Sequence, residues 1–203
     1  MITIIDYDAG NLHSVQNALV KLGEKGIVTR EEDKILSSDR VILPGVGAFG
    51  DAMRLLDSYG LVDVIHKVVQ KQIPLIGICL GMQILFEESE ESSGVRGLGL
   101  LKGRIRRIPD QNGALKVPHM GWNDLSFPNR GDLFEGVHEG SFVYFVHSYY
   151  LKAEDPAIVT ARTQYGVSID ASVQKGKLFG CQFHPEKSSD VGLQILKNFL
   201  RKH

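Results

Sequence analysis

The chain has 203 residues, of which 43% are hydrophobic and 23% are charged, and its formal net charge is −1. This composition is typical of one folded domain with a sizeable core, and the near-zero charge excludes a strongly basic surface for nucleic acid or anionic membrane. Two cysteines, Cys79 and Cys181, without a C-x-x-C pair, exclude a disulfide framework and a thiol-rich metal site. The first residues lack a basic signal region and no apolar run is long enough for a membrane span, so we expect a soluble, cytoplasmic protein.

The first half of the chain alternates between short apolar segments and helical periods. A strand predicted at residues 2–6 is followed by a helix over residues 11–23, which Asn11 caps and Gly23 ends. Further strands are predicted at residues 26–30 and 40–44, a helix at 61–69, a strand at 74–78 that leads into Cys79, and a helix at 84–91. Strands that alternate with helices predict a mostly parallel central sheet with helices on both faces.

The pattern changes after the acidic run at residues 87–94, which we expect to be a solvated loop. Strand-like segments follow at residues 100–108, 141–151, 157–163 and 177–183, and some of them are expected to pair antiparallel. A helix over residues 190–203 ends the chain, with Leu193, Leu196 and Leu200 on one face. The whole pattern predicts a single α/β domain over residues 1–203.

The stretch GICLG places Cys79 between two glycines at the junction of a predicted strand and a predicted helix. A side chain at the apex of such a turn is presented at the carboxyl edge of the sheet, as in the G-x-S-x-G nucleophile elbow. The free N–H groups of the following helix favour the thiolate, and the Leu80 N–H is placed to stabilise an oxyanion. Taken alone, the motif leaves open a second interpretation, in which Cys79 is a small buried residue at a strand end.

A nucleophilic thiol needs a base and a group that orients the base, and HPE at residues 184–186 offers both. In extended backbone, residues i and i+2 project to the same side, so Glu186 can hold the imidazole of His184. A His-x-Glu pair is common by chance, so it indicates a catalytic role only in combination with the cysteine elbow. Cys181 lies inside a predicted strand, where packing is its expected role.

The glycine cluster PGVGAFG at residues 44–50 matches G-x-G-x-x-G and follows a predicted strand. The dinucleotide-binding interpretation fails on context, because the next strand ends in Cys79 and not in an acidic residue, and because Pro44 interrupts the entry to the turn. We instead predict a mobile turn at Gly45, Val46 and Gly47, beside the elbow, whose N–H groups face a carbonyl oxygen.

At these residues the chain resembles the class I, triad-type glutamine amidotransferases, with Cys79, His184 and Glu186 at the three triad positions. Within this family, the chain resembles one branch in particular, the glutaminase subunits of imidazole glycerol-phosphate synthases. It is carried by blocks that span nearly the whole chain, at residues 4–19, 44–50, 77–91, 118–123, 144–150 and 182–188. Asp8 departs from this pattern, because a small residue is expected there.

The resemblance implies a chemistry in which the Cys79 thiolate attacks the side-chain carboxamide of L-glutamine. His184, oriented by Glu186, protonates the leaving ammonia and then activates water to hydrolyse the γ-glutamyl thioester. The oxyanion is held by N–H groups of Leu80 and of the turn at 45–47. Substrate contacts are implied for Gln83, His147, Ser148 and Tyr149. The residues alone leave open that Gln83 is a solvated helix residue and that His147 is a satisfied core residue.

Almost every segment is used by this predicted fold, so a partner must supply the acceptor of the ammonia. The resemblance implies a (β/α)8-barrel cyclase subunit, a heterodimer, and the products imidazole glycerol phosphate and aminoimidazole carboxamide ribonucleotide of histidine biosynthesis. It implies no cofactor and no metal. Met120 and Trp122 are large apolar residues among polar ones, which indicates an interface, although Trp122 could instead cap the local core. The resemblance adds Asn11, Ser14 and Lys187 to this interface.

Three other functions are compatible with the same residues. One is a stand-alone cysteine hydrolase or peptidase of the same sheet architecture, which would work without a partner. Another is an amidotransferase subunit that serves a different synthase. The third is a scaffold subunit with an inert thiol, which would tolerate the loss of Cys79 in every assay.

Overall fold

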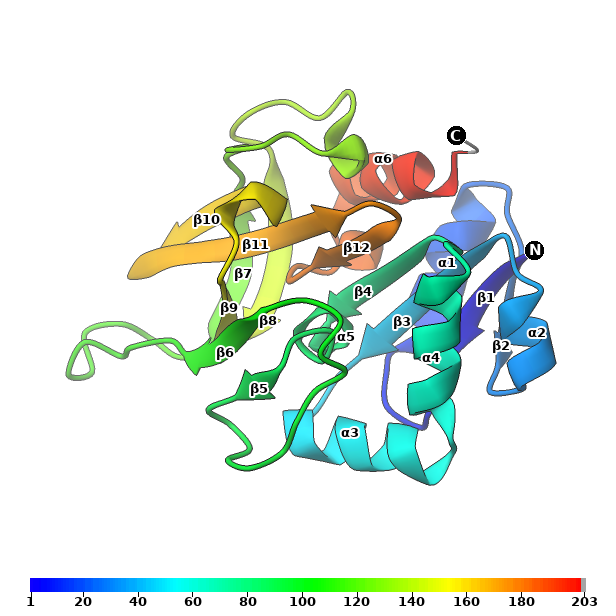
Figure 1. The fold of residues 1–203 in the computed structure, drawn as a ribbon. Helices are drawn as coiled ribbons and strands as arrows, with labels where there is room; N and C mark the ends of the chain where they lie inside the picture. Colours follow the sequence, from blue (N-terminus) through cyan, green and yellow to red (C-terminus); the bar gives the residue numbers. More distant parts are fainter. Residues whose placement is uncertain (202–203) are drawn as a thin grey trace.

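A sheet of seven strands forms the centre of the fold, in the order β10-β11-β12-β4-β3-β1-β2 (Figure 1). The structure is a computed structural model and describes residues 1–201. Parallel pairing joins β2 (Gly26–Thr29), β1 (Ile2–Ile5), β3 (Arg40–Gly45), β4 (Leu75–Cys79) and β12 (Leu178–Cys181). Antiparallel pairing adds β11 (Val167–Lys175) and β10 (Val159–Tyr165). The predicted class, a mostly parallel sheet with antiparallel strands from the second half, is confirmed.

The inner parallel strands are buried on both faces, which explains their almost uninterrupted apolar sequences. Every residue of β1 and β4 is buried. Alternate side chains of one strand enter different cores, because Leu43 packs in one hydrophobic cluster and Ile42 in the other. A polar substitution at either position would therefore place an unpaired group in a dry interior.

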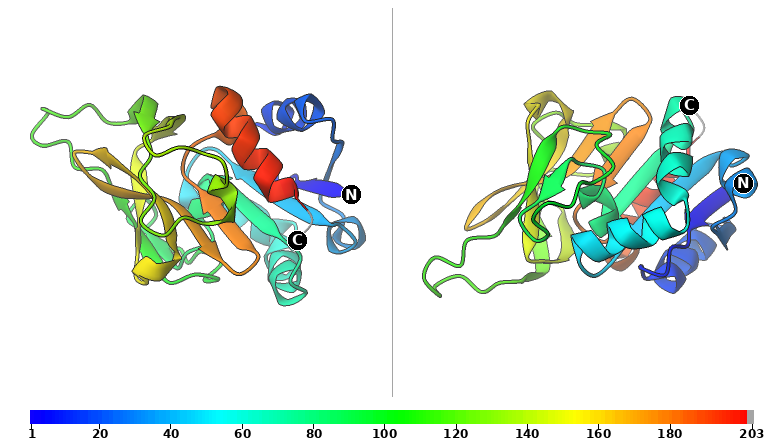
Figure 2. Two further views of the ribbon diagram at one scale, coloured as in Figure 1. Left: turned by 90° about the horizontal axis from the view of Figure 1, so that it is seen from above. Right: turned by 60° about the horizontal axis from the view of Figure 1, so that its bottom comes forward.

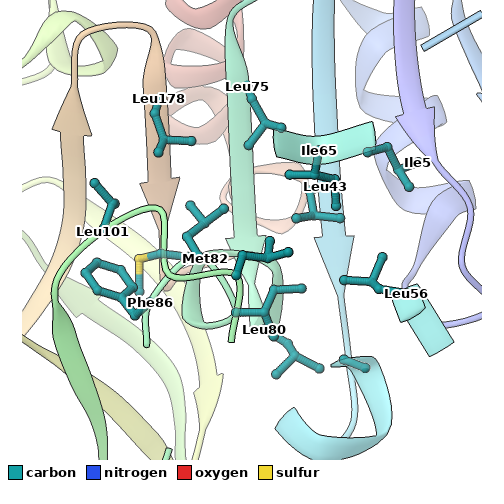
Figure 3. Close-up of a cluster of buried hydrophobic side chains, with 14 of the residues drawn as sticks. Ile5, Leu43, Leu56, Ile65, Leu75, Leu80, Met82, Phe86, Leu101 and Leu178 are labelled. Carbon is teal, nitrogen blue, oxygen red and sulfur yellow. The ribbon is translucent and has the colours of Figure 1, made fainter. Parts of the chain in front are cut away.

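Helices cover both faces of this sheet (Figure 2). One face packs against α2 (Glu32–Leu36), α3 (Phe49–Ser58) and α4 (Leu61–Gln70), and the other against α1 (Leu12–Lys21) and α6 (Ser189–Leu200). Figure 3 shows the first core, where Leu56 and Ile65 of the helices meet Leu43 and Leu75 of the sheet. Sequence analysis placed α1 and α4 but did not predict α3, which begins inside the glycine cluster.

The ends of two helices follow from side-chain capping. The Oδ1 atom of Asn11 accepts a hydrogen bond from the Ser14 N–H at 3.2 Å, so Asn11 is the predicted N-cap of α1. At the end of α6, the Arg40 guanidinium donates to the Phe199 carbonyl at 3.0 Å. That helix ends at Leu200, and the last two residues of the predicted helix lie outside the described residues.

The buried face of α6 differs from the predicted one. Ile195, Leu196 and Phe199 are buried, whereas Leu193 and Leu200 are only partly buried. The helix is pressed against the chain at Gly192, where an added Cβ would lie 1.9 Å from the Pro185 carbonyl oxygen. This close approach rotates the face that contains Gly192, Ile195 and Phe199 toward the core.

The predicted helix at residues 84–91 is wrong, because the helix after the elbow, α5, spans only Leu80–Gln83. The returning segment at residues 98–101 takes the carbonyl groups that a longer helix would need. Its N–H groups donate to the carbonyls of Ile84, Leu85 and Phe86 at 2.8–3.2 Å. Those three consecutive residues are all buried, which a surface helix with one apolar face does not allow.

The remaining strands form two small assemblies beside the main sheet, and all but one of their strand pairs are antiparallel. One contains β5 (Glu88–Ser89), β6 (Gly103–Arg107) and β9 (Tyr149–Ala153), and the other pairs β7 (His119–Asp124) with β8 (Phe142–His147). The predicted strand at 141–151 is therefore two strands that belong to different sheets. Short 3-10 turns η1 (Asp132–Phe134), η2 (Pro156–Ile158) and η3 (Pro185–Lys187) complete the described chain. In residues 1–201, no helix has the length and apolarity that a membrane crossing requires.

Glycine at the elbow is a steric requirement, and substitution of Gly81 tests it. An alanine Cβ there would lie 1.9 Å from the Leu43 carbonyl oxygen, a backbone atom that cannot move aside. We expect Gly81→Ala to lower the free energy of unfolding by about 3 kcal/mol or more, the upper end of overpacking costs. Gly176→Ala, at φ +59° with open space around it, should cost only about 1–2 kcal/mol. Equal losses in urea unfolding would contradict the steric argument.

Candidate active site

Cys79 is the last residue of β4, and helix α5 begins at the next residue. Its backbone has φ +55° and ψ −111°, a conformation that costs a non-glycine residue about 1–3 kcal/mol. The close approach of α5 to the sheet holds this conformation, because Gly77 and Gly81 leave no space for a side chain between them. The structure thus places the thiol at the apex of a strained strand-to-helix turn, at the carboxyl edge of the parallel strands.

His184 follows β12, which pairs with β4 so that Cys181 lies opposite Ile78. The Nδ1 atom of His184 is 2.8 Å from Oε1 of Glu186, and both side chains are at most 3% exposed. With Nδ1–H donated to the carboxylate, Nε2 is the atom available for chemistry. Nε2 has no hydrogen-bond partner among residues 1–201. The predicted i, i+2 arrangement of imidazole and carboxylate is present in the structure.

The charge state of His184 follows from its surroundings. Burial alone lowers the pKa of this imidazole, but its interactions with the Cys79 sulfur and the Glu186 carboxylate outweigh burial and raise the pKa to about 10. An imidazolium at neutral pH therefore faces the sulfur, and an adjacent positive charge favours the thiolate.

One pocket of about 380 Å³ brings most of the predicted site residues together. Its size suits a small polar ligand. It is lined by Val46, Gly47, Cys79, Leu80, Gln83, Glu91, Pro118, Val146, His147, Ser148, Tyr149, His184 and Lys187. Gly45 and Glu186 lie behind it, around a much smaller cavity that Asn11 also lines.

Comparison with known proteins decides the family. The model of the glutamine amidotransferase class-I family matches residues 3–203. The chain belongs to the class-I glutamine amidotransferases. It is 52% identical to the imidazole glycerol phosphate synthase subunit HisH of Moorella thermoacetica, and 52% identical to the HisH subunit of Bacillus cereus, each match covering 98% of this chain and 93% of the relative. A crystal structure described as a glutamine amidotransferase shares the fold with TM-score 0.75 at 22% identity, covering 98% of this chain and 99% of that one.

The turn at residues 45–47 of this amidotransferase is held at both of its ends. Before it, the Tyr7 hydroxyl donates to the Pro44 carbonyl at 2.8 Å. After it, the Phe49 N–H donates to the Glu91 carboxylate at 2.8 Å. Between these anchors, Gly47 has φ +100°, a conformation that glycine adopts without cost. The segment between these anchors, at Val46 and Gly47, lines the pocket.

Glu91 is a pocket residue that sequence analysis missed. The acidic run was expected to be solvated, but Glu91 is half-buried, lines the pocket and caps the first turn of α3. Ser92 assists by accepting the Gly50 N–H at 2.9 Å. No local sequence pattern indicates this role, because the helix it caps begins 42 residues earlier in the chain.

His147 lines the pocket of the amidotransferase, but both of its ring nitrogens are committed to the protein. Its Nδ1 lies 2.9 Å from the Tyr149 carbonyl oxygen, so Nδ1 carries the proton and Nε2 accepts. The Nδ1–H of His119 then donates to that Nε2 at 3.0 Å, and the Asn123 amide donates to Nε2 of His119 at 3.3 Å. This geometry favours the interpretation that His147 is a buried residue whose ring hydrogen bonds are satisfied within the protein. Contact with a molecule in the pocket is then left to the backbone of residues 147–149.

The predicted interface residues surround the pocket mouth. Met120 and Trp122 are 61% and 53% exposed on one face of β7, because alternate residues of a strand point to the same side. The residues opposite them in β8 are Val146 and Tyr144. This exposure contradicts the alternative in which Trp122 caps the core. Phe142 is also exposed, on the same face of β8, and extends this apolar surface; it lay inside the predicted strand at 141–151 but was not predicted as an interface residue.

Of the other predicted interface residues, Lys187 lines the pocket and Asn11 lines the small cavity behind it. Asn11 and Ser14 are partly exposed at the start of α1, and Lys187 is exposed at the pocket edge. In residues 1–201, no group of three or more His, Cys, Asp or Glu side chains is arranged to hold a metal ion.

The buried histidine pair predicts acid sensitivity of the fold. Burial lowers the pKa of His119 to about 4 and that of His147 to about 3. Between about pH 4 and 6.5 these two imidazoles are protonated in the unfolded chain but neutral in the native state. Their contribution to the free energy of unfolding is therefore complete above about pH 6.5 and falls as the pH drops. Over most of this window His184, with its raised pKa, is protonated in both states and contributes little slope; only near pH 6.5 and above, where the unfolded histidine loses its proton, does it oppose the trend.

We expect the free energy of unfolding, measured with urea at a series of pH values, to fall by up to about 1.4 kcal/mol per pH unit for each of the two histidines. His119→Phe keeps the ring stacking on Phe145 and Tyr165 but removes one titration, so its slope should be smaller. His13→Asn, an exposed substitution, is the control and should leave the slope unchanged. Parallel slopes for His119→Phe and the unaltered protein would show that the pair is not responsible.

Proposed function

We propose that this chain is the glutaminase subunit of an imidazole glycerol phosphate synthase and that residues 1–203 form one amidotransferase domain. The observation that carries the proposal is the pocket in which the strained Cys79 faces the buried pair of His184 and Glu186. The 52% identity to HisH subunits over 98% of the chain supports the choice of synthase. A cytoplasmic location is proposed with it, from the biosynthetic role of those relatives.

The first half of the reaction forms a thioester. The Cys79 thiolate attacks the carboxamide carbon of glutamine, and the carbonyl electrons move to oxygen. As the tetrahedral intermediate collapses, the bond from carbon to nitrogen breaks and the nitrogen takes a proton from Nε2 of His184, leaving as ammonia. The charge of Glu186 stabilises the imidazolium before this transfer and keeps the Nδ1 proton in place.

The second half returns the enzyme to its starting state. Nε2 of the now neutral His184 accepts a proton from water as the oxygen attacks the thioester carbon. Collapse of the second tetrahedral intermediate breaks the bond to sulfur, so glutamate leaves and the thiolate is restored beside the imidazolium. The same nitrogen acts once as acid and once as base, which its position in the pocket and its lack of another partner permit.

The oxyanion of both intermediates is assigned to backbone donors. Leu80 is the first residue of α5, so its N–H is one of the groups that a helix start leaves unpaired. Gly45, the last residue of β3, pairs with Cys79, and Val46 and Gly47 follow it at the pocket wall, so this segment can present a second N–H. Removal of one such donor costs about 10²–10³ in rate.

Substrate recognition is assigned to the polar groups at the pocket walls. The side-chain nitrogen of Gln83 already donates to the Tyr149 carbonyl and to Gln182, both at 2.9 Å, so Gln83 offers its oxygen as an acceptor. The Glu91 carboxylate is a natural partner for the ammonium group of an amino acid. The backbone of the segment at Ser148 and Tyr149 completes the wall.

A partner is part of this proposal. The relatives are subunits of a synthase. The proposed partner is a (β/α)8-barrel cyclase that consumes the ammonia and forms imidazole glycerol phosphate and aminoimidazole carboxamide ribonucleotide. A stand-alone hydrolase would not need the exposed surface of Met120, Trp122 and Phe142 beside the pocket. A scaffold with an inert thiol would not need the strained backbone at Cys79.

Glutaminase turnover of the chain alone, with the cyclase, and with the cyclase and its nucleotide ligand tests the function. We expect the isolated chain to be nearly silent and the liganded complex to be about 10²–10³ faster, the worth of one oxyanion donor that the turn at 45–47 supplies. Imidazole glycerol phosphate should form only in the complete mixture. Cys79→Ser should abolish both reactions. A rate for the isolated chain that equals the rate of the liganded complex would favour the stand-alone hydrolase.

The exposed surface of β7 and β8 makes a separate prediction about binding. Trp122→Ala should weaken cyclase binding at least tenfold in titration calorimetry, because buried aromatic anchors contribute about 2 kcal/mol or more to interfaces. Ile27→Ala is the control, since Ile27 is 42% exposed on the edge strand β2, away from the pocket. Unaltered affinity and unaltered glutaminase activation in Trp122→Ala would remove this surface from the interface.

A further inference from the structure

Gln182 is a fully buried polar residue that the proposed mechanism does not use. It follows the last residue of β12, and residues spaced by two along an extended chain project to the same side. Gln182 therefore shares the side of His184, toward the sulfur. Gly180, two residues before it, leaves room for α5, because an added Cβ would lie 2.5 Å from Cγ of Met82.

The orientation of the Gln182 amide is fixed by a chain of hydrogen bonds. The chain begins at the Tyr149 carbonyl oxygen, which can only accept, so the side chain of Gln83 must turn its nitrogen toward it at 2.9 Å. The same nitrogen of Gln83 donates to Oε1 of Gln182 at 2.9 Å. Nε2 of Gln182 is then directed at Sγ of Cys79, 3.6 Å away.

This sulfur is the partner that the Gln182 nitrogen needs. Among residues 1–201, Nε2 of Gln182 makes no other hydrogen bond, and a buried amide left unpaired costs about 1–3 kcal/mol. A neutral thiol is a weak acceptor, whereas a thiolate accepts with its full charge. The amide N–H therefore interacts more strongly with the thiolate of Cys79 than with its neutral thiol.

A second contact of the sulfur has the opposite preference. The Val146 carbonyl oxygen lies 3.9 Å from Sγ and can accept only from the neutral S–H. Besides the charge of His184, two uncharged groups therefore act on Cys79. The Gln182 amide favours the thiolate, and the Val146 carbonyl favours the neutral thiol. The longer distance to Val146 makes the Gln182 contact the stronger of the two.

We propose that Gln182 is a positioning residue for Cys79, whose amide N–H fixes the direction of the sulfur and favours the thiolate. The proposal rests on the proposed function only in taking Cys79 as the nucleophile. The Gln182 amide acts in addition to the charged or titratable groups near the sulfur. These are Tyr7, Glu91, His147, Cys181, His184, Glu186 and Lys187.

Alkylation of Cys79 by iodoacetamide, followed over pH, tests the proposal on the full chain without any partner. Gln182→Met keeps the length of the side chain and removes the donor. We expect the midpoint of the pH profile to move up by about one unit, which lowers the alkylation rate about tenfold at pH values below both midpoints, while the rate at high pH is retained. Peptide mapping assigns the label, and the fully buried Cys181 should remain unlabelled.

Gln174→Met is the matched control. Gln174 lies on β11 of the same sheet and donates its amide to Asp132 at 2.6 Å, so its replacement removes a similar hydrogen bond away from the sulfur. The pH profile of this variant should coincide with that of the unaltered protein. A Gln182→Met profile that also coincides, or one that is lowered equally at every pH, would overturn the proposal, because packing alone changes no midpoint.

Gln182→Glu keeps the inference testable if the methionine variant does not fold. It retains an acceptor for Gln83 but directs an oxygen at the sulfur, so the midpoint should move up further than in Gln182→Met; an unmoved midpoint would overturn the proposal. The glutaminase assay separates this result from the proposed function. If the complex hydrolyses no glutamine while the midpoint still moves, the function fails and the role of Gln182 toward Cys79 stands.

Discussion

The close contact between α5 and strand β3 is the constraint on which the site depends. A carbonyl of β3 and the backbone of Gly81 occupy the space that any side chain would need. Cys79 is held in its strained conformation because Leu80 and Met82, on either side of this glycine, are buried in the core. Core packing therefore offsets the roughly 1–3 kcal/mol of local strain that presents the sulfur to the pocket.

Sheet topology then assembles the chemistry around that sulfur. β12 enters the sheet beside β4 although about a hundred residues separate them, and parallel pairing brings the carboxyl ends of both strands to one edge. The same fold places histidines in opposite environments. His184 has a carboxylate and a sulfur as neighbours, which raise its pKa, whereas burial lowers the pKa of His147. His184 is therefore placed to exchange protons, and His147 is a neutral part of the pocket wall.

Local patterns allowed most strands of the main sheet and the helices α1 and α4 to be predicted, because each depends on residues close in sequence, whereas β7 and β11 were not predicted. The Cys-His-Glu arrangement was predicted from two local motifs, the cysteine elbow and the His-x-Glu pair, together with the family resemblance. The features that were missed depend on distant partners. Glu91 caps a helix 42 residues earlier, and Gln182 meets the sulfur across a separation of 103 residues. The helix predicted at 84–91 failed for the same reason, since the segment at 98–101 takes its carbonyl groups.

The exposed apolar surface and the sulfur are separated by a single strand pair. Met120 lies opposite Val146, and the carbonyl of Val146 is the one that faces Sγ of Cys79. Directly opposite residues in antiparallel strands have Cα atoms about 4.5–5.5 Å apart, so a molecule that covers β7 contacts the strand pair that forms one wall of the pocket. A ligand shifts an equilibrium only through different contacts with its two states. In this fold such contacts need no long pathway, because β8, which carries part of the surface, also supplies the Val146 carbonyl that faces the thiol.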